Sequence, residues 1–348
     1  MNNTKAYAAY NANDDLAPFE FNRRDLKAND VLIDILYCGI CHSDIHLVKG
    51  DWPGARYPLV PGHEIVGKVK AVGADVTKFK IGDTAGVGVF VDSCKTCKNC
   101  KNDFENYCEE GMTGTYSELE RDGVTITQGG YSTQIVVDAN YVLKVSAQLD
   151  LKAVAPLLCA GITTYSPLRY AGVSAGMKVG VVGLGGLGHM GVKFASSFGA
   201  EVTVLSTSPE KEADAKKLGA HHFLLTTDAE QMKKSRNYFD VILNTVSANH
   251  DYDMYLNLLD LNGKLLVVGL PAAPPKTSPF ALVNNRRSII GSKIGGIKET
   301  QEMLDYCAEK NIVADVELIA IQDINKAYNR IVNGDVHYRF VIDLASLK

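Results

Sequence analysis

Short apolar runs alternate with amphipathic segments over the second half of the chain. Residues 178–183, KVGVVG, are typical of a buried parallel strand, and an apolar helix is predicted after it, over 189–200. Further strands are predicted at 201–206, 222–225, 239–244, 264–269 and 288–292, with helices at 209–218 and 252–260. Six strands with interleaved helices predict an α/β fold built on a doubly wound parallel Rossmann sheet.

A glycine-rich turn follows the first of these strands directly. The turn reads GLGGLG, and its residues include Gly183, Gly185, Gly186, Leu187 and Gly188. A bare G-x-G-x-x-G is weak evidence, but a strand before it and a helix after it are typical of a dinucleotide site. In such a site the glycines let the backbone approach a pyrophosphate at a helix N-terminus. We therefore predict a dinucleotide cofactor at this turn.

Small hydroxyl residues stand at the end of the second strand. Rossmann domains that bind NAD place an Asp or Glu there, which accepts hydrogen bonds from the ribose 2′-OH. Here the segment is LSTSPEK, with Ser206, Thr207 and Ser208 followed by Lys211. Hydroxyls and a lysine suit a 2′-phosphate, which a carboxylate would repel. The sequence therefore favours NADP(H) over NAD(H).

Length, charge and hydropathy narrow the class of protein. A chain of 348 residues predicts two domains, and 46% hydrophobic with 22% charged residues is ordinary for a soluble protein. The formal net charge of −4 gives no sign of a nucleic-acid partner. The N-terminus shows no secretory pattern, and the longest apolar run, 179–192, is shorter than the roughly 20 residues of a membrane span. We expect a cytoplasmic protein with no membrane partner.

Half of the eight cysteines fall in one short stretch, CKTCKNCKNDFENYC. They are Cys94, Cys97, Cys100 and Cys108. A reducing cytoplasm argues against a disulfide, and the two-residue spacing lets thiolates converge on a tetrahedral zinc ion. The intervening lysines, which can offset the charge of the thiolates, are Lys95, Lys98 and Lys101. We predict a closed, structural zinc site, with unrelated buried cysteines or a redox pair as the alternatives.

Three further residues make up a second possible ligand set. Cys41 lies in CGICHSDIH, His63 in PGHEIVG and Cys159 in PLLCAG. A Cys₂His set occurs in catalytic zinc sites, where a fourth position stays open for water or substrate. Each residue alone is a weak signal, because a lone buried cysteine is usually a small hydrophobe. The other two cysteines, Cys38 and Cys307, are predicted to be core residues.

These motifs together resemble the zinc-dependent medium-chain alcohol dehydrogenases, specifically their cinnamyl alcohol dehydrogenase branch, over nearly the whole chain. The segments that carry the resemblance are CGICHSDIH, YPLVPGHEIVG, CKTCKNCKNDFENYC, QGGYS, APLLCAGITTYSPL, GLGGLGHMGVKFA and GDVHYRFVID. The resemblance implies a mainly-β GroES-like catalytic domain built from residues 1–155 and 296–348. It implies a Rossmann NADP-binding domain at 156–295 inserted between them, and a homodimer.

The resemblance also implies the metal ligands. Cys41, His63 and Cys159 match the ligands of the catalytic zinc, so that two zinc ions per chain are expected together with the four-cysteine loop. Glu64 matches a nearby acid that can exchange with water on the metal. Asp44 matches a carboxylate that steadies the zinc-bound histidine.

The remaining implied roles concern the proton and the cofactor. Ser43 and His46 match a proton relay, in which the serine replaces a threonine common in the branch. Thr163 matches a residue beside the nicotinamide, and Arg339 one near the pyrophosphate. In alcohol oxidation the zinc would lower the pKa of the alcohol, the relay would carry its proton to solvent, and hydride would pass to the nicotinamide. Aldehyde reduction would run in reverse.

The single tryptophan bears on the substrate. Trp52 lies in KGDWPGARYP, between Cys41 and His63. In the family that the chain resembles, this loop lines the substrate cleft, so the indole is expected to offer apolar area to an aromatic aldehyde. The alternative is that Trp52 packs in the core of its domain. We expect NADP(H)-linked interconversion of neutral primary alcohols and aldehydes, with aromatic ones of the cinnamyl or benzyl type preferred.

Two other interpretations stay open. A polyol or other secondary-alcohol dehydrogenase would share the fold, although such enzymes usually keep an acid after the second Rossmann strand. A zinc-binding interaction or nucleic-acid module is prompted by the four-cysteine loop, but the net charge and the dinucleotide pattern argue against it. A zinc-free quinone reductase is disfavoured because all seven predicted metal ligands are present.

Overall fold

The computed structural model describes residues 2–347 and divides the chain into two compact units. The first unit consists of Met1–Cys159 and Gly295–Lys348, and the second of Ala160–Ile294. The sequence predicted these divisions after residues 155 and 295. The chain therefore leaves the first unit once, forms the second, and returns.

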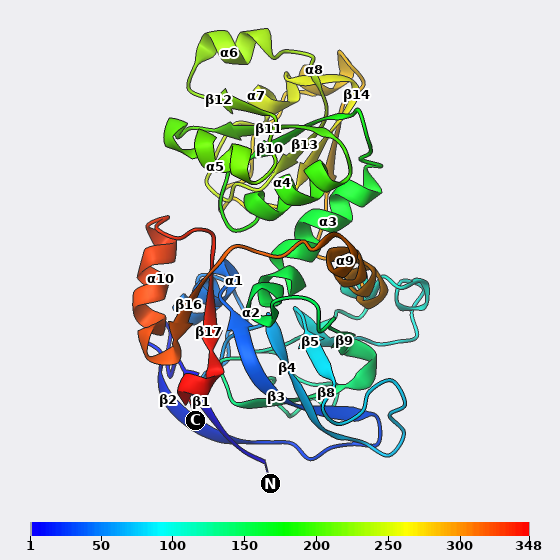
Figure 1. Cartoon of the computed structure of the whole chain (residues 1–348), viewed down its shortest axis with the longest axis vertical. Coiled ribbons are helices and arrows are strands. Elements are labelled where there is room, and N and C mark those ends of the chain that lie inside the picture. The colour runs from blue at the N-terminus through cyan, green and yellow to red at the C-terminus, as the bar shows by residue number, and fades with distance from the viewer. Residues whose placement is uncertain (1, 348) are drawn as a thin grey trace. The chain divides into compact units, whose positions relative to one another are not determined.

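The second unit contains a six-stranded parallel sheet with the strand order β12-β11-β10-β13-β14-β15 (Figure 1). This is the Rossmann order, in which the first strand of the unit lies at the centre of the sheet. The strands are β10 (Lys178–Val182), β11 (Glu201–Ser206), β12 (His222–Leu225), β13 (Phe239–Asn244), β14 (Leu259–Val267) and β15 (Ser288–Gly291). The helices are α3 (Ala160–Tyr170), α4 (Gly188–Ser197), η5 (Pro209–Lys211), α5 (Glu212–Lys217), α6 (Ala229–Lys234), α7 (Tyr252–Leu256) and α8 (Pro279–Val283). All six predicted strands are confirmed.

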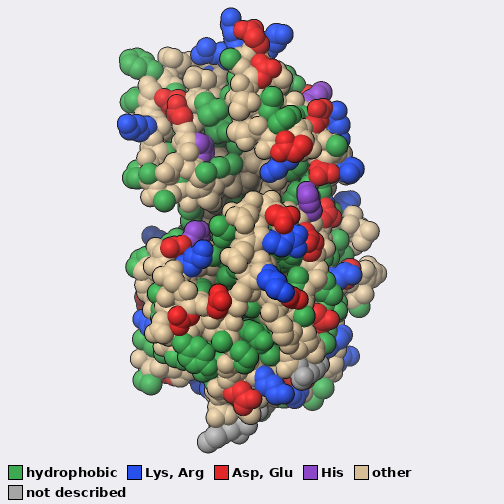
Figure 2. Space-filling view, turned by 90° about the vertical axis from the view of Figure 1, so that its left-hand side faces the viewer, with side chains coloured by type: hydrophobic (Ala, Val, Ile, Leu, Met, Phe, Trp, Pro, Cys, Tyr) green, Lys and Arg blue, Asp and Glu red, His purple; other side chains and the backbone are tan. Residues whose placement is uncertain are grey.

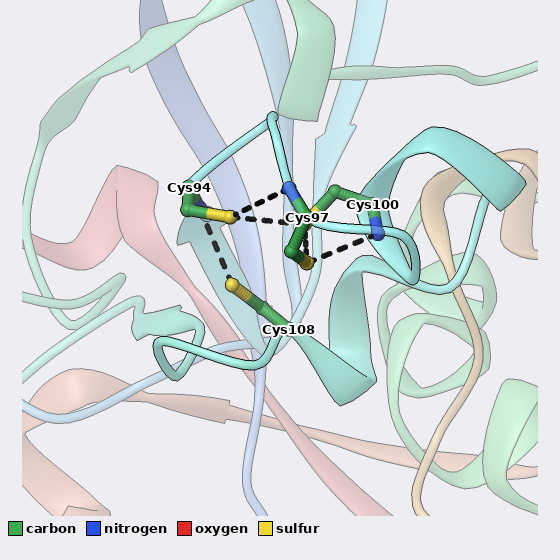
Figure 3. Close-up of side chains that lie close together, drawn as sticks. All are labelled: Cys94, Cys97, Cys100 and Cys108. Atoms are coloured by element: carbon green, nitrogen blue, oxygen red, sulfur yellow. Dashed lines mark hydrogen bonds between the residues drawn. The ribbon is translucent and has the colours of Figure 1, made fainter.

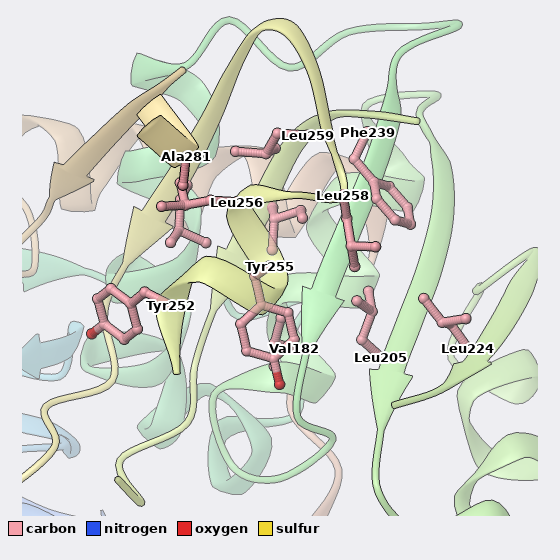
Figure 4. Close-up of a cluster of buried hydrophobic side chains, with 12 residues drawn as sticks. Val182, Leu205, Leu224, Phe239, Tyr252, Tyr255, Leu256, Leu258, Leu259 and Ala281 are labelled. Atoms are coloured by element: carbon pink, nitrogen blue, oxygen red, sulfur yellow. The ribbon is translucent and has the colours of Figure 1, made fainter. Parts of the chain in front are cut away.

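A cluster of buried apolar side chains supports one side of this sheet (Figure 4). Val182, Leu205 and Phe239 reach it from three strands, while Tyr255 and Leu256 reach it from α7. The central strands are buried on both faces, which explains their continuous apolar runs. Burial of these side chains fixes the carboxyl ends of the strands, where Rossmann folds bind their ligands.

The helices of this unit differ in part from the prediction. The predicted helix at 252–260 ends at Leu256, because Leu259 already pairs with Phe239 as the start of β14. Helices α3, α6 and α8 were not predicted. Helix α6 buries no residue and so has no apolar periodicity, but the Asp228 side chain caps it by accepting from the backbone of Glu230 and Gln231.

The first unit is mainly β-structure. Its seven-stranded sheet has the order β16-β17-β3-β4-β5-β9, with β8 also paired to β3. The strands are β3 (Asp30–Gly39), β4 (Ile65–Val72), β5 (Thr84–Val87), β8 (Gln134–Asp138), β9 (Leu143–Lys144), β16 (Val316–Ala320) and β17 (Arg339–Asp343). Strand β17 pairs with β3, with Val341 opposite Gly39, so the two ends of the chain share one sheet. This pairing explains how one domain forms from both ends of the sequence.

Smaller elements complete the first unit. They are β1 (Asn2–Ala8), β2 (Ala17–Arg23), α1 (His42–Lys49), β6 (Phe90–Asp92), η1 (Cys100–Asn102), η2 (Glu105–Tyr107), β7 (Thr113–Gly114), η3 (Ala139–Tyr141), α2 (Leu151–Val154), η4 (Ala155–Leu158), α9 (Ile297–Lys310), η6 (Ile321–Asp323), α10 (Ile324–Val332) and η7 (Leu344–Leu347). As predicted, Cys38 and Cys307 are both fully buried, in β3 and α9.

The surface carries charges of both signs. On the face drawn in Figure 2, acidic and basic side chains are interspersed, and that face shows no extended basic patch. Between residues 2 and 347, no helix combines the length and the apolar character that a membrane crossing requires.

Candidate active site and metal centres

The four cysteines of the 94–108 loop converge (Figure 3). All eight cysteines are free, and the four sulfur atoms of this loop lie within 4.8 Å of one another. The Cys94 and Cys100 sulfurs are 3.8 Å apart, and those of Cys97 and Cys100 are 3.4 Å apart. Four sulfurs at about 2.3 Å from a tetrahedral zinc ion would lie about 3.8 Å apart. The loop therefore fits a zinc ion.

Backbone amides surround these sulfurs. Cys97 donates its N–H to the Cys94 sulfur at 3.3 Å, Cys100 donates to Cys97 at 3.5 Å, and Cys94 donates to Cys108 at 3.4 Å. The amides of Cys97 and Thr96 lower the pKa of the Cys94 thiol to about 6, which favours the thiolate that binds metal. Backbone N–H groups of the loop thus stabilise the thiolate form of these cysteines.

Two of the three lysines between the cysteines also pair with carboxylates, and their predicted compensation of the thiolate charge stays a prediction. Lys95 pairs with Asp92 at 3.2 Å and Asp138 at 2.8 Å, and Lys98 pairs with Glu109 at 3.3 Å. Long lysine side chains reach carboxylates beyond the loop, whereas the backbone amides are already at the sulfurs. A cation also lies at the sulfurs, since the Arg121 guanidinium reaches the Cys108 sulfur at 3.9 Å.

The loop is tied to helix α9 of the same unit. Glu105 accepts a hydrogen bond from the backbone of Ile297 at 3.1 Å, and Asp103 pairs with Lys298 at 3.0 Å. A side chain at Gly296 would collide with the Asp103 carbonyl, so the helix begins against the loop. These contacts give the loop a structural role.

A second cluster assembles from three distant segments. Cys41 is the residue before α1, His63 precedes β4, and Cys159 follows η4. Their ligand atoms and a carboxylate oxygen of Glu64 all lie within 4.8 Å of one another. The Cys41 and Cys159 sulfurs are 3.9 Å apart, the spacing of two thiolates on one zinc ion. A hydrogen bond from Cys159 lowers the pKa of Cys41 well below its ordinary value.

The imidazole of His63 shows how this cluster would use a metal. Its Nδ1 lies 3.2 Å from Oδ1 of the buried Asp44, while its Nε2 is buried and has no hydrogen-bond partner. An unpaired buried nitrogen is costly, and a metal ion would satisfy it. A histidine ligand usually gives its other ring N–H to a carboxylate in this way. The residues present therefore fit a zinc ion.

Glu64 and Arg339 form a buried ion pair beside the cluster. Arg339 donates from Nη2 to Glu64 Oε1 and, at 2.7 Å, to the Ile40 carbonyl. Glu64 Oε2 is buried without a partner, and burial raises the pKa of this carboxyl to about 7 against the opposing effect of Arg339. The pyrophosphate contact that was predicted for Arg339 stays a prediction.

The predicted relay residues lie on α1. The hydroxyl of Ser43 is 3.6 Å from the Cys41 sulfur, and Nδ1 of His46 is 2.9 Å from Oδ2 of Asp51. Within residues 2–347, no direct hydrogen bond joins Ser43 to His46. Asp51 was not among the predicted relay residues, because no local pattern in the sequence places its carboxylate against His46.

Trp52 lies outside the core. Its side chain is 37% exposed, and its ring stacks on that of His46 with centroids 5.0 Å apart. Tyr116 stacks on the His63 ring at 5.8 Å, and it also lines a groove of about 290 Å³. The groove is lined by Leu47, Pro53, Gly54, Arg56, Tyr116, Ser117, Glu118 and Leu119. Through Tyr116, this groove of apolar and polar side chains adjoins the second cluster.

In the second unit, the glycine-rich turn has the geometry of a pyrophosphate site. Gly183 has a φ of +86°, which favours glycine, and a side chain at Gly188 would collide with the Gly183 carbonyl. Gly185 faces open space, since a side chain there would meet no atom within 4 Å. Gly186 completes the turn, and Leu187 directly precedes α4. The backbone of this turn is open to a ligand.

The predicted 2′-phosphate residues lie at the end of β11. Ser206 accepts a hydrogen bond from the Ser208 backbone at 3.1 Å, and Thr207 between them is exposed. Lys211 reaches back to the glycine-rich turn, donating from Nζ to the Leu184 carbonyl at 3.2 Å. Thr163, expected beside the nicotinamide, lies buried on the first turn of α3.

Comparisons with known proteins agree with this geometry. Residues 27–147 match the alcohol dehydrogenase GroES-like domain family, and residues 186–309 match the zinc-binding dehydrogenase family. The chain is 52% identical to an NADP-dependent alcohol dehydrogenase C of Mycobacterium bovis, over 100% of both chains. It is also 52% identical to a probable mannitol dehydrogenase of Medicago sativa, over 98% of this chain and 94% of the relative.

Solved structures give the same assignment. The cinnamyl alcohol dehydrogenase SbCAD4 of Sorghum bicolor superposes with a TM-score of 0.96 at 45% identity, over 99% of both chains. A CAD from Helicobacter pylori complexed with NADP(H) has a TM-score of 0.93 at 45% identity, also over 99% of both chains. The chain therefore belongs to the zinc-dependent medium-chain alcohol dehydrogenases, in their cinnamyl alcohol dehydrogenase branch.

Proposed function

We propose that this chain is a zinc-dependent, NADP(H)-linked oxidoreductase that interconverts primary alcohols and aldehydes, with aromatic substrates preferred. The observation that carries the proposal is the imidazole of His63, whose buried Nε2 has no partner and faces a cluster with Cys41 and Cys159. An apolar core would not retain this arrangement, whereas a catalytic metal site requires it.

Two zinc ions per chain are proposed. One would be held by Cys41, His63 and Cys159, and the other by the four cysteines of the 94–108 loop. When bound at the first site, zinc supplies a Lewis acid that polarises a carbonyl or lowers the pKa of an alcohol. The carboxylate of Glu64 lies among the same ligand atoms, within reach of the open position.

The chain supplies the path for the proton. The Ser43 hydroxyl, beside Cys41, would hydrogen-bond to the oxygen of the substrate. Asp51 holds Nδ1 of His46, which leaves Nε2 as the atom that exchanges a proton. Because no hydrogen bond joins Ser43 to His46 among the described residues, a bridging hydroxyl or water is part of the proposal.

The cofactor proposal rests on the second unit. The turn 183–188 would bind the pyrophosphate, and Ser206, Thr207, Ser208 and Lys211 would bind the 2′-phosphate. Lys211 already lies beside the glycine-rich turn through its bond to Leu184. The names of the mycobacterial relative and of the H. pylori complex support NADP(H). Strand β11 ends at Ser206, so the carboxylate that would repel a 2′-phosphate is absent at the end of this strand.

A substrate panel tests the proposal. Purified enzyme would be assayed with cinnamaldehyde, benzaldehyde and acetaldehyde, each with NADPH and with NADH. We expect the highest kcat/KM for an aromatic aldehyde with NADPH. Short aldehydes should lose, because each methylene left unburied forgoes about 0.8 kcal/mol. Turnover that is highest with NADH, or with acetaldehyde, would contradict the cofactor or the substrate assignment respectively.

A polyol dehydrogenase is a second candidate, favoured by the relative named as a probable mannitol dehydrogenase. Arg56, Ser117 and Glu118 give the groove polar groups that could bind hydroxyls. Adding mannitol with NADP to the panel separates the two. Mannitol oxidation at a kcat/KM above that of cinnamyl alcohol would favour the second candidate.

A homodimer and a cytoplasmic location are also proposed. Strand β15 is the edge of its sheet and has no second strand partner among the described residues, and Ile289 on it is 38% exposed. An exposed apolar edge strand favours pairing with another chain. Light scattering would give the mass in solution. The eight free cysteines are consistent with a reducing compartment.

A further inference from the structure

Asp44 is fully buried and accepts hydrogen bonds at both of its carboxylate oxygens. Its Oδ1 lies 3.2 Å from Nδ1 of His63 and accepts from the backbone of Gly62 at 3.1 Å. Its Oδ2 accepts from the backbone of Cys41 at 2.8 Å and from the hydroxyl of Tyr131 at 3.3 Å. Tyr131 thus reaches this carboxylate from a segment that carries none of the metal ligands.

The Tyr131 hydroxyl is itself oriented by a neighbour. The hydroxyl of Tyr131 accepts from that of Tyr328, on α10, at 3.4 Å, and both side chains are buried. The proton of Tyr131 is thereby directed to Asp44. A series of hydrogen bonds thus leads from Tyr328 through Tyr131 to Asp44, whose other oxygen lies beside the imidazole of His63. Tyr116 also lies near this carboxylate, since burial and Asp44 together raise the pKa of its phenol.

Backbone contacts hold Tyr131 against the segment that carries His63. A side chain at Gly62 would come within 2.6 Å of the Tyr131 ring, so this glycine permits the close approach. Three amides of the tyrosine segment donate to the carbonyls of 60–62. They are Gly129 to Val60 at 2.7 Å, Gly130 to Gly62 at 2.9 Å and Tyr131 to Pro61 at 3.0 Å. The ring therefore cannot shift without moving the loop of His63.

Arg23, at the end of β2, anchors the other side of the tyrosine segment. Its guanidinium donates to the carbonyls of Gln134 at 3.0 Å and Gly129 at 2.9 Å, and to the Ser132 hydroxyl at 2.9 Å. Charged donors form the stronger hydrogen bonds of a protein. The segment is thus fixed on both sides.

We propose that Tyr131 is a positioning residue for the metal centre formed by Cys41, His63 and Cys159. Its hydroxyl holds Asp44, and Asp44 holds the His63 ring so that Nε2 faces the two sulfurs. Tyr328 orients Tyr131 by donating a hydrogen bond to its hydroxyl. The inference rests on the proposed function, since it takes His63 as a zinc ligand.

Metal release tests the inference independently of activity. Wild type and variants, loaded with zinc, would be mixed with excess dipicolinate, and the zinc released would be followed with a chromogenic indicator. Tyr131→Phe keeps the ring and removes the hydroxyl, so one of the two zinc ions should leave about tenfold faster. Tyr328→Phe, one step further out, should speed the same ion by about threefold, below the range for a direct partner.

Tyr238→Phe is the matched control. Tyr238 also donates its hydroxyl to a carboxylate, that of Glu201 at 2.5 Å, but it lies in the second unit. Both zinc ions of this variant should leave at the wild-type rate. Thermal unfolding of all three variants would show that the folds are comparable.

The outcomes separate the inference from the proposed function. Release from Tyr131→Phe at the wild-type rate, or an equal acceleration of both ions, would overturn the positioning role. If Tyr131→Phe does not fold, Tyr328→Phe decides by the same criterion. A wild type that holds only one zinc, or a Cys41→Ser variant that retains two, would instead refute the proposed metal site.

Discussion

The two groups of possible metal ligands in the first unit are assembled in different ways. The four cysteines of the 94–108 loop are close in sequence, and backbone amides of the same loop surround their sulfurs. Cys41, His63 and Cys159 come from distant segments that only the folded unit brings together. A local site depends on its own turn geometry, whereas a dispersed site depends on the whole fold.

Their surroundings differ in the same sense. The cluster of Cys41, His63 and Cys159, here called the dispersed cluster, has buried charged side chains beside it, namely Asp44 and the Glu64–Arg339 pair. The loop cluster lies nearer the surface, with Cys94 and Cys97 half-buried. Side chains that tune a metal can also be varied by mutation, while backbone amides cannot. The dispersed cluster should therefore respond more strongly than the loop cluster to changes around it, although the side chains of Ser93 and Arg121 also reach loop sulfurs, at 3.2 Å from Cys100 and 3.9 Å from Cys108.

The largest effect is expected when a ligand of the dispersed cluster is removed. Cys41→Ser should lower turnover by about 1000-fold or more, because the metal that activates the substrate is lost. The fold should persist, since the loop cluster and its contacts with α9 are untouched. Elemental analysis should find one zinc per chain, and kcat should fall at unchanged circular dichroism.

Cys38→Ala is the matched control for this prediction. Cys38 is buried three residues earlier but is not among the ligand atoms. It should keep two zinc ions and most of the activity. A Cys41→Ser enzyme with undiminished kcat would break the distinction between the clusters.

Loss of a loop ligand should act on stability instead. Cys100→Ser leaves three thiolates and a hydroxyl, which hold zinc poorly, and so frees the loop that borders α9. A loss of about 3 kcal/mol would lower Tm by roughly 10 °C in a unit of this size. Scanning calorimetry would measure Tm, and kcat well below Tm should stay near the wild-type value. A Tm equal to that of wild type would count against a structural metal.

The same difference governs what the sequence could predict. The loop cysteines follow from their spacing alone, and the Rossmann strands follow from apolar runs that fill a sheet buried on both faces. Residue types alone made Cys41, His63 and Cys159 only a possible ligand set, and the resemblance was needed to assign them, because no local pattern records which distant segments meet. Asp51 was missed for the same reason: a carboxylate in a surface loop carries no signal until the fold places it against His46.

A smaller effect is expected when the carboxylate of Asp44, which lies beside His63, is replaced. Asp44→Asn keeps the size of the side chain but weakens its hold on His63, so the affinity for one zinc should fall by about 10- to 100-fold. Competition with a chelator of known affinity would measure this. Asp92→Asn, beside the loop cluster, is the control and should leave both affinities unchanged, because the Asp92 carboxylate pairs with Lys95 and accepts from the backbone of Ser93, which is not a predicted ligand. An equal loss in both variants would show that the two clusters are tuned alike.

The smallest effect concerns the open side of the dispersed cluster, which the closed loop cluster lacks. Trp52 is partly exposed and stacks on His46, so Trp52→Ala removes both an apolar surface and a support for the relay. Stacking of an aromatic substrate is worth about 1 kcal/mol, so kcat/KM for cinnamaldehyde should fall by roughly five- to tenfold. Acetaldehyde cannot stack, and its kcat/KM should fall less. Equal losses on the two aldehydes would mean that Trp52 acts through His46 alone and does not contact the substrate.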